Sequence, residues 1–251
     1  MAALLLWLGF FRVLRRRTAL LLTCLDFLVA GGLLLAAVLP ANSFYGPVLV
    51  QGPAEQKIVA LTFDDGPYPP YTQELLKVLK EEQVRATFFL VAANATKHPE
   101  LIQQEVAAGH EIGLHCYQHR DWLKLSAEEL EEELRLGKEA LQQVTGGEVR
   151  YCRPPHGFKD WQVLENIRQA GLRTVNWSVL PRDWINPGTE IIVARVLEQM
   201  HPGAIVLLHD GDSPFYRAPR EQTVRATREI IRKLRGQGYR FVTIAELESS
   251  K

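Results

Sequence analysis

Three short segments of the sequence carry side chains that could perform metal and acid–base chemistry together. Asp64 and Asp65 are adjacent, His115 and His119 are four residues apart, and His209 lies far along the chain. Two imidazoles and one carboxylate from the aspartate pair would form a three-ligand metal site, and such a site leaves positions open for water or a substrate oxygen. The other carboxylate, beside the cation, would stay ionised and could act as a general base.

Each of these features also has a purely structural interpretation when it is taken alone. Histidines four residues apart are common on helix surfaces, and the Asp-Gly-Pro that begins at Asp65 is a turn sequence in its own right. The chemical interpretation therefore depends on whether the fold brings the segments together, which the pattern of strands and helices predicts.

Apolar, β-rich runs alternate with helical patterns along residues 57–251. This alternation predicts an α/β fold with a parallel sheet. Ser126 and Glu129 have the spacing of a capping box at the start of the third helix. Strands are expected at 57–63, 86–91, 111–114, 150–153, 174–179, 204–208 and 240–244, and helices at 72–82, 99–108, 127–144, 161–170, 190–200 and 220–235.

Seven units in this length favour a (β/α)7 barrel, similar to a TIM barrel that is one unit short. An open doubly wound sheet is the alternative, but such sheets usually carry a glycine-rich phosphate loop, and neither GxGxxG nor GxxxxGK[ST] occurs here. In a barrel the carboxyl ends of the strands share one face. Residues that follow strand ends should therefore converge, and they are Asp64, Asp65, His115, His119, Arg153, Asp183, Trp184, His209 and Asp210.

The beginning of the chain predicts a membrane-spanning helix. Residues 18–39 are almost wholly apolar and long enough to cross a hydrocarbon layer of about 30 Å. Four arginines precede this run and no Lys or Arg follows it before Lys57, which predicts that residues 1–17 are a basic cytoplasmic N-terminus. A cleaved signal peptide is the alternative, although this run exceeds the usual apolar region of about 7–15 residues in such peptides.

This orientation places the rest of the chain outside the cytoplasm. Residues 40–56 contain Pro, Asn, Ser and Gly without an apolar period and are expected to be a tether. Residues 57–251 are expected to form one domain. The sequence thus predicts a single-pass protein of the cell membrane with an extracytoplasmic domain.

The composition argues against other kinds of partner. The chain has 251 residues with 29 basic and 29 acidic side chains, so it lacks the net positive charge that nucleic-acid binding requires. Its three cysteines cannot form a disulfide framework or a four-cysteine zinc site. Any metal must therefore be held mainly by histidines and carboxylates. No feature of the sequence predicts a protein partner.

These segments together resemble the five ordered motifs of the polysaccharide deacetylases, carbohydrate esterase family 4, whose domain is also called the NodB homology domain. The resemblance covers residues 57–248 and implies a distorted (β/α) barrel that removes acetyl groups from glycans by metal-dependent hydrolysis. The motifs lie at 62–67, at the His115/His119 pair, at 153–157, at Asp183-Trp184 and at 207–209.

The resemblance also implies roles for the chemical residues. It makes Asp65, His115 and His119 the metal ligands. Asp64 would be the general base toward a metal-bound water that acts as nucleophile, and His209 would be the general acid that protonates the departing amine.

Further residues would support these groups. The resemblance implies that Arg153 holds the base, that Asp183 orients or tunes the acid, and that the backbone N–H of His156 helps to stabilise the oxyanion. Among the tryptophans, we expect Trp184 to line the substrate pocket.

Three positions depart from the family pattern. Cys116 stands where a Ser or Thr is usual, His156 replaces a usual aromatic residue, and Leu180 stands where the fourth motif commonly begins with Asp. The loss of this Asp bears most directly on how the general acid is tuned.

The sequence therefore predicts a polysaccharide deacetylase that acts on an N-acetylated glycan such as peptidoglycan or a chitin-like polymer of N-acetylglucosamine. Its cofactor would be a divalent metal, with Zn²⁺ as the first choice and Co²⁺ or Fe²⁺ as alternatives. The alternative function is a non-catalytic, glycan-binding membrane protein on a degenerate deacetylase fold, which the departures at His156 and Leu180 suggest.

Overall fold

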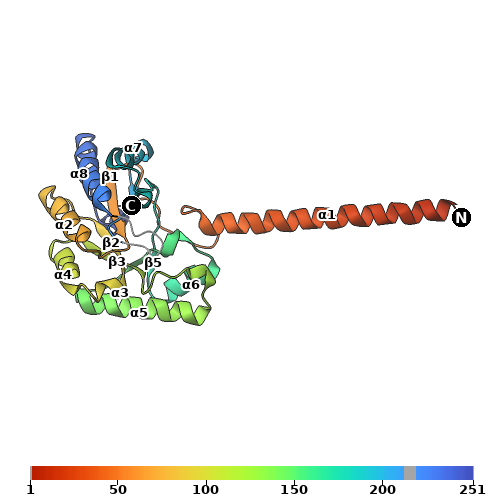
Figure 1. Cartoon of the computed structure of the whole chain (residues 1–251), viewed down its shortest axis with the longest axis horizontal. Coiled ribbons are helices and arrows are strands. Elements are labelled where there is room, and N and C mark those ends of the chain that lie inside the picture. Colours follow the sequence, from red (N-terminus) through yellow and green to blue (C-terminus); the bar gives the residue numbers. More distant parts are fainter. Residues whose placement is uncertain (1, 212–218, 251) are drawn as a thin grey trace.

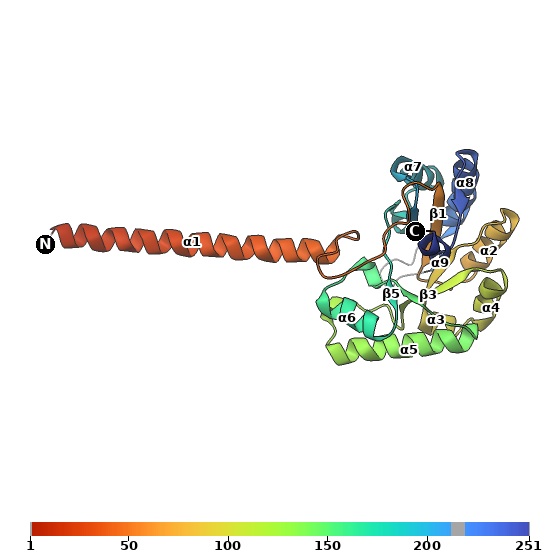
Figure 2. The same ribbon diagram turned by 180° about the vertical axis from the view of Figure 1, so that it is seen from behind.

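A computed structural model describes residues 2–211 and 219–250 of the chain. A helix of 37 residues, α1 (Ala2–Val38), projects from an α/β domain that contains the other elements (Figures 1 and 2). Within this helix, Thr18–Val38 is apolar and long enough to cross a membrane, and only 11% of its apolar window is buried. The helix is thus not a core element of the domain, and it fits either a membrane span or a signal sequence.

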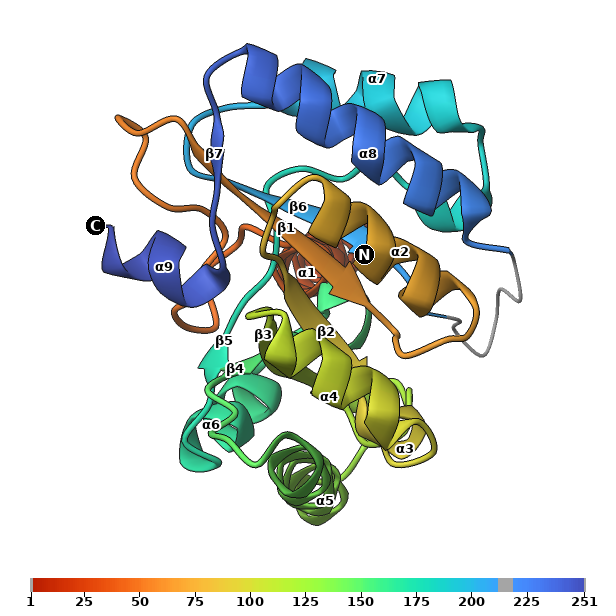
Figure 3. The same cartoon turned by 90° about the vertical axis from the view of Figure 1, so that its left-hand side faces the viewer.

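The domain is built on a parallel sheet in the order β5-β4-β3-β2-β1-β6, with β7 paired to the beginning of β1 (Figure 3). β1 and β2 are buried along their whole length, as expected for parallel strands covered on both faces. The strands are β1 (Ile58–Asp64), β2 (Thr87–Val91), β3 (Glu111–Cys116), β4 (Tyr151–Cys152), β5 (Arg173–Thr174), β6 (Ala204–His209) and β7 (Arg240–Phe241).

Isolated bridges link the two ends of this sheet. Val179, in the segment after β5, forms a parallel bridge with Val206 of β6, and Leu49 forms another with Val175. The predicted strand at 174–179 is therefore present as a two-residue strand followed by these bridges. The parallel α/β arrangement is confirmed, and the bridge between the two ends is consistent with a distorted seven-stranded barrel.

Helices connect the strands and cover the sheet (Figure 3). The six predicted helices are present, and each begins and ends within one residue of its predicted bounds. The capping box of Ser126 and Glu129 is confirmed. The helices of the domain are α2 (Tyr71–Glu81), α3 (Ala92–Ala95), α4 (Pro99–Ala107), α5 (Ala127–Thr145), α6 (Trp161–Gln169), α7 (Thr189–Gln199), α8 (Glu221–Gly236) and α9 (Ile244–Ser249), with the short 3-10 helices η1 (Trp122–Lys124), η2 (Pro155–Gly157) and η3 (Asp183–Ile185).

The last predicted strand is too long. β7 ends at Phe241, whereas the prediction extended it to residue 244. Thr243 and Glu246 form a capping box that satisfies the first free N–H groups of α9, so a helix begins where the apolar pattern suggested a strand.

The segment 40–56, expected to be a tether, packs on the domain. Leu49 pairs with Val175, and Gln51 forms an antiparallel bridge with Ala204. The Gly52 amide also donates to the Gly203 carbonyl at 2.8 Å. Because its backbone pairs with residues at both ends of the sheet, this segment does not behave as a free linker.

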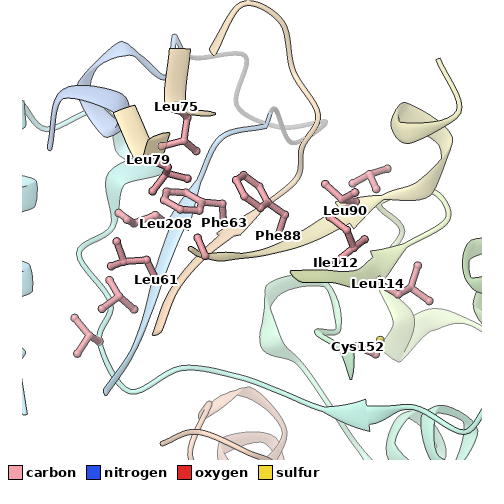
Figure 4. Packing of buried hydrophobic residues seen from close by; sticks show 14 of the residues in the cluster. Leu61, Phe63, Leu75, Leu79, Phe88, Leu90, Ile112, Leu114, Cys152 and Leu208 are labelled. Atoms are coloured by element: carbon pink, nitrogen blue, oxygen red, sulfur yellow. The ribbon is translucent and has the colours of Figure 1, made fainter. Parts of the chain in front are cut away.

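The hydrophobic core around β1 and β2 fixes where these strands end (Figure 4). Phe63 and Phe88 stack with ring centroids 5.3 Å apart, and Leu75 and Leu79 of α2 lie beside Phe63. All four side chains are fully buried, and each such burial stabilises the fold by about 1.5–3 kcal/mol. Since Asp64 directly follows Phe63, this packing holds the first polar residue of the site in place.

Glu105 is a buried carboxylic acid without a hydrogen-bond partner for its side chain among the described residues. Glu105 of α4 is fully buried, and neither of its carboxylate oxygens has a hydrogen-bond partner there. Burial, with a smaller contribution from the charge of Asp210, raises the pKa of Glu105 well above its ordinary value. The fold therefore favours the neutral form of this side chain.

Replacing Glu105 by glutamine should stabilise the protein at neutral pH. Because its pKa is raised in the folded state, ionisation of Glu105 does not lower the free energy of unfolding at low pH. It lowers this free energy as the pH rises above the ordinary pKa of 4.5. We expect Glu105→Gln to raise the Tm at pH ~7.5 by about 2 °C or more, and to have little effect at pH ~4. Thermal unfolding of both proteins measures the shift, and the exposed Glu100→Gln on the same helix is the control. An equal shift at both pH values would contradict this account.

Candidate active site

The carboxyl ends of the strands bring distant polar residues to one place. The register between β1 and β6 aligns Asp64 with His209. β3 and β4 are paired one residue before His115 and Arg153, respectively. The convergence that the barrel pattern predicted is therefore present at the ends of four strands, and the loops after these strands add the remaining groups.

Asp65, His115 and His119 form a cluster that could hold a metal ion. One ligand atom from each lies within 4.8 Å of the others. The Nε2 atoms of His115 and His119 lie 3.3 and 3.4 Å from the same Asp65 oxygen, Oδ1. That oxygen is buried and has no hydrogen-bond partner among the described residues. Two imidazole nitrogens thus converge on a buried carboxylate oxygen that lacks a hydrogen-bond partner. This set fits a divalent cation with two imidazole ligands and one carboxylate ligand.

The surroundings orient these histidines as ligands. The Nδ1 of His115 lies 2.8 Å from the Arg153 carbonyl oxygen; an N–H there donates to this oxygen and leaves Nε2 free for a metal. Burial and the charge of His115 lower the pKa of His119 to about 4, so His119 is neutral at pH 7. Burial opposes a charge on His115 too, but Asp64 and Asp65 outweigh it and raise the pKa of His115. A cation and a proton would therefore compete for this ring.

The neighbouring carboxylate, Asp64, is held by a buried guanidinium. Arg153 Nη1 donates to Asp64 Oδ1 at 2.6 Å and to Thr62 Oγ1 at 2.8 Å. The guanidinium carbon also lies 4.2 Å from the centre of the Phe89 ring. Both charged side chains are almost fully buried, and removing one partner of such a pair typically costs about 3–5 kcal/mol. The two adjacent aspartates thus differ in their main partners. Asp64 accepts from Arg153 and has His115 Nδ1 4.0 Å from its other oxygen, whereas Asp65 faces both imidazoles.

His209 is anchored by a second buried carboxylate. Asp183 Oδ1 lies 2.8 Å from His209 Nδ1, while Asp183 Oδ2 accepts from the His209 amide and from Thr223 Oγ1. Burial alone would lower the pKa of His209, but the charge and hydrogen bond of Asp183 raise it above the ordinary value. The missing aspartate at Leu180 therefore does not leave His209 without a carboxylate partner.

A cavity of about 740 Å³ joins the two clusters. Trp184 lies on its wall and meets the His209 ring edge-on, with centroids 5.3 Å apart. Arg153 and Asp183 lie behind the wall and contact Asp64 and His209, respectively, which face the cavity. Of the nine predicted site residues, seven line it: Asp64, Asp65, His115, His119, His156, Trp184 and His209.

Strained backbone is concentrated at this cavity. Asp65, His156 and Arg182 line it and have φ angles of 73°, 60° and 56°, in the left-handed region that non-glycine residues rarely adopt. Such strain, of order 1–3 kcal/mol for each residue, persists only where the surrounding structure enforces it. At Asp65 the strained turn directs the carboxylate toward the histidines.

Gly211 provides the space that this turn needs. Its amide donates to the Asp64 carbonyl at 3.2 Å, and a Cβ atom at this position would lie 1.9 Å from the Asp65 carbonyl carbon. The clash is with backbone, which a change of rotamer cannot relieve. The backbone of Asp65 can therefore take its position only if residue 211 has no side chain.

One detail of the site differs from what the spacing of the histidines suggests. The four-residue spacing of His115 and His119 is common on helix surfaces, but this pair does not lie on a helix. His115 instead lies in β3, and His119 lies beyond the strand end in the following loop. A bend in this loop, with ring centroids 5.0 Å apart, replaces the helix in bringing the two imidazoles together.

Some supporting residues were not predicted. Thr62 contacts Arg153, Thr223 contacts Asp183, and the buried Arg220 lines the cavity and donates to the Gly211 carbonyl. Only Thr62 could have been found from the sequence, because it lies two residues before Asp64 in a strand and therefore on the same face.

Cys116 is buried, and burial raises the pKa of its thiol well above the ordinary value, so it is a neutral packing residue.

Replacing Asp183 should lower the pKa of His209. The carboxylate is what raises this pKa against the effect of burial, so Asp183→Asn should shift the titration of the ring to lower pH. A pH titration of the ring by NMR, assigned with His209→Gln, measures the shift. Asp121→Asn, which changes another carboxylate of the cavity wall, is the control. An unchanged titration in Asp183→Asn would show that another group sets the pKa of His209.

Comparisons with known proteins agree on one family, the deacetylases of polysaccharides. A family model described as polysaccharide deacetylase matches residues 51–175. A peptidoglycan-N-acetylglucosamine deacetylase of Bacillus cereus is 41% identical over 204 residues, which cover 80% of this chain and 93% of the relative. A chitooligosaccharide deacetylase of Sinorhizobium fredii is 41% identical over 187 residues, which cover 72% of this chain and 87% of the relative.

Solved structures are similar as well. The structure of a CE4 family pseudoenzyme from Bacillus anthracis matches with a TM-score of 0.74 and 30% identity, covering 80% of this chain and 68% of that chain. The fold, the ordered motifs and these matches agree: the chain belongs to the polysaccharide deacetylases, carbohydrate esterase family 4.

Proposed function

We propose that this protein hydrolyses N-acetyl groups of an N-acetylglucosamine-containing glycan with the help of a divalent metal. The observation that carries the proposal is the shared cavity, in which the Asp65, His115 and His119 cluster faces Asp64 and His209. A metal site, a paired carboxylate and a protonatable imidazole are the groups that amide hydrolysis needs.

The metal would be held by Asp65, His115 and His119, with Zn²⁺ as the first choice for this set of ligands and Co²⁺ or Fe²⁺ as alternatives. When bound there, it would supply Lewis acidity toward the acetyl carbonyl and lower the pKa of water.

The chain's own residues would perform the proton transfers. Asp64, oriented by Arg153, takes a proton from water as its oxygen adds to the acetyl carbon. The backbone N–H of His156 donates to the oxygen that becomes negative. His209, whose protonated form Asp183 favours, gives its proton to the nitrogen as the C–N bond breaks. The products are acetic acid, which ionises to acetate, and a glycan with a free amine. Asp64 then gives its proton to solvent, and His209 takes one from solvent.

The shape of the cavity supports a sugar substrate. Besides the polar groups, its wall contains apolar side chains, among them Phe158, Trp184, Ile185 and Leu207. A flat aromatic face next to a few fixed polar groups is suited to a sugar ring. By their names, the relatives act on peptidoglycan and on chitooligosaccharides, which both carry N-acetylglucosamine.

A second candidate is a non-catalytic glycan-binding protein. The similarity to a CE4 family pseudoenzyme and the Leu180 departure favour it. The presence of both aspartates, both histidines of the proposed metal site and the His209–Asp183 pair favours the hydrolase.

Replacing the proposed base should abolish hydrolysis without loss of metal. We expect Asp64→Asn to reduce acetate release by about 100-fold or more, since general-base catalysis is typically worth 10²–10⁴-fold. Metal analysis should give the same content as in the unmodified protein, because Asp65 and the histidines are unchanged. Asp160→Asn, at the start of α6 and outside the cavity wall, is the matched control.

The same assay separates the two candidates. A hydrolase loses acetate release in the presence of a chelator and regains it with Zn²⁺. Glycan binding that persists without metal, together with no acetate release under any condition, would support the non-catalytic protein. Unchanged turnover in Asp64→Asn would remove the proposed base.

We also propose that α1 anchors the protein in the cell membrane with the domain outside the cytoplasm. The apolar segment Thr18–Val38 and the arginines before it support this orientation.

An N-terminal epitope tag tests the proposed anchor. We expect the tagged, full-length chain to stay in the membrane fraction after an alkaline carbonate wash, because an embedded helix is held by its apolar surface. Protease added outside intact cells or spheroplasts should reach the domain. A shorter, soluble chain without the tag would instead identify a cleaved signal peptide.

A further inference from the structure

The carboxyl-terminal end of α1 is bound to the domain by several hydrogen bonds. The backbone N–H of Lys159 donates to the Ala37 carbonyl at 3.0 Å, and its Nζ donates to the Leu39 carbonyl at 2.7 Å. Asn176 Nδ2 donates to the Pro40 carbonyl at 3.2 Å. Ala36 and Ala37 are buried, in contrast to the exposed side chains described for residues 18–35. The helix end is thus seated on the domain.

Lys159 is suited to this position by its charge. The last carbonyls of a helix lack intrahelical donors and carry partial negative charge, which a lysine ammonium satisfies. The side chain is fully buried, and burial lowers the pKa of Lys159 to about 8, so most molecules remain charged at pH 7. A buried ammonium is costly unless it is paired, and its hydrogen-bond acceptor here is Leu39. The domain therefore depends on the helix end to satisfy this charge.

The same contacts reach the active site. Asn176 Nδ2 also donates to the Gly157 carbonyl at 3.1 Å, and the Asn176 carbonyl accepts from Arg153 Nη2. Gly157 directly follows His156, and Phe158 lines the cavity. Two connections therefore link the loop of the third motif, residues 154–158, to the end of α1. Asn176 contacts both Gly157 and residue 40, and Lys159, which follows the loop, contacts residues 37 and 39.

We infer that Lys159 and Asn176 are positioning residues that use the end of α1 to hold the 154–158 loop in its catalytic conformation. The inference rests on the proposed function, in which the His156 N–H faces the developing oxyanion. His156 has a strained backbone with φ of 60°, so its conformation must be enforced by its surroundings. The contacts at Gly157 and Lys159, directly after this residue, supply that restraint. The α1 end is consequently a structural part of the active site.

The chain provides a matched pair of variants for the test. Lys138 Nζ donates to the Ala170 carbonyl at 2.7 Å, at the end of α6 and away from the cavity. Lys159→Met and Lys138→Met each remove one lysine–carbonyl bond and keep an unbranched apolar side chain. Both variants are made in the full-length chain and measured in detergent for kcat, KM, metal content and amide exchange of residues 156–159.

We expect Lys159→Met to lower kcat by about tenfold, less than the 10²–10³-fold cost of removing an oxyanion donor, because the loop is loosened rather than lost. KM and metal content should stay unchanged, and amides 156–159 should exchange faster. Lys138→Met should leave kcat and these amides unchanged. Equal kcat and equal exchange in the two variants would overturn the inference.

The unmodified protein gives a test that needs no variant. Because the Lys159 amide donates to Ala37, it should exchange as slowly as the amides of α6. Fast exchange at Lys159 would overturn the inference even if Lys159→Met did not fold. If the unmodified protein releases no acetate, the proposed function fails, while the exchange measurements still decide whether the helix end holds the loop.

Discussion

The buried contacts of Arg153 connect the parts of this site. Its guanidinium donates to Asp64 and Thr62 in β1 and to the Asn176 carbonyl after β5. Its own carbonyl receives the Nδ1 hydrogen bond of His115 in β3. One residue therefore sets the position of the proposed base and the orientation of one proposed metal ligand. A charge buried this deeply is tolerated only when it is paired, so the fold and the site depend on the same interaction.

Separate anchors give neighbouring groups different properties. Asp64 is bound to Arg153, whereas Asp65, the next residue, faces two imidazoles across a strained turn. His209 has its own buried carboxylate, Asp183, which favours the protonated ring. Because protein contacts hold each group in place, the site is preorganised, and little rearrangement is needed when charge develops during a reaction.

Much of this arrangement could be predicted from the sequence, because periodicity and motif order depend on local chemistry. The helix bounds and the convergence at strand ends follow from apolar spacing and from parallel topology. The capping box at Thr243 was missed because the apolar residues around it also fit a strand. The roles of Asn176 and Lys159 could not be found, since a polar residue destined for burial looks like a surface residue until its partner is known. Their partners at the end of α1 lie more than 100 positions away.

The close contact between Gly211 and the Asp65 backbone affects how related sequences should be judged. A member of the family that keeps every proposed ligand, base and acid of the five motifs would still displace the backbone of residue 65 if it carried a single methyl group at this position. A comparison of functional side chains alone would then fail to identify such a protein as inactive. The absence of a side chain at residue 211 belongs in the signature of an intact site as much as the histidines do.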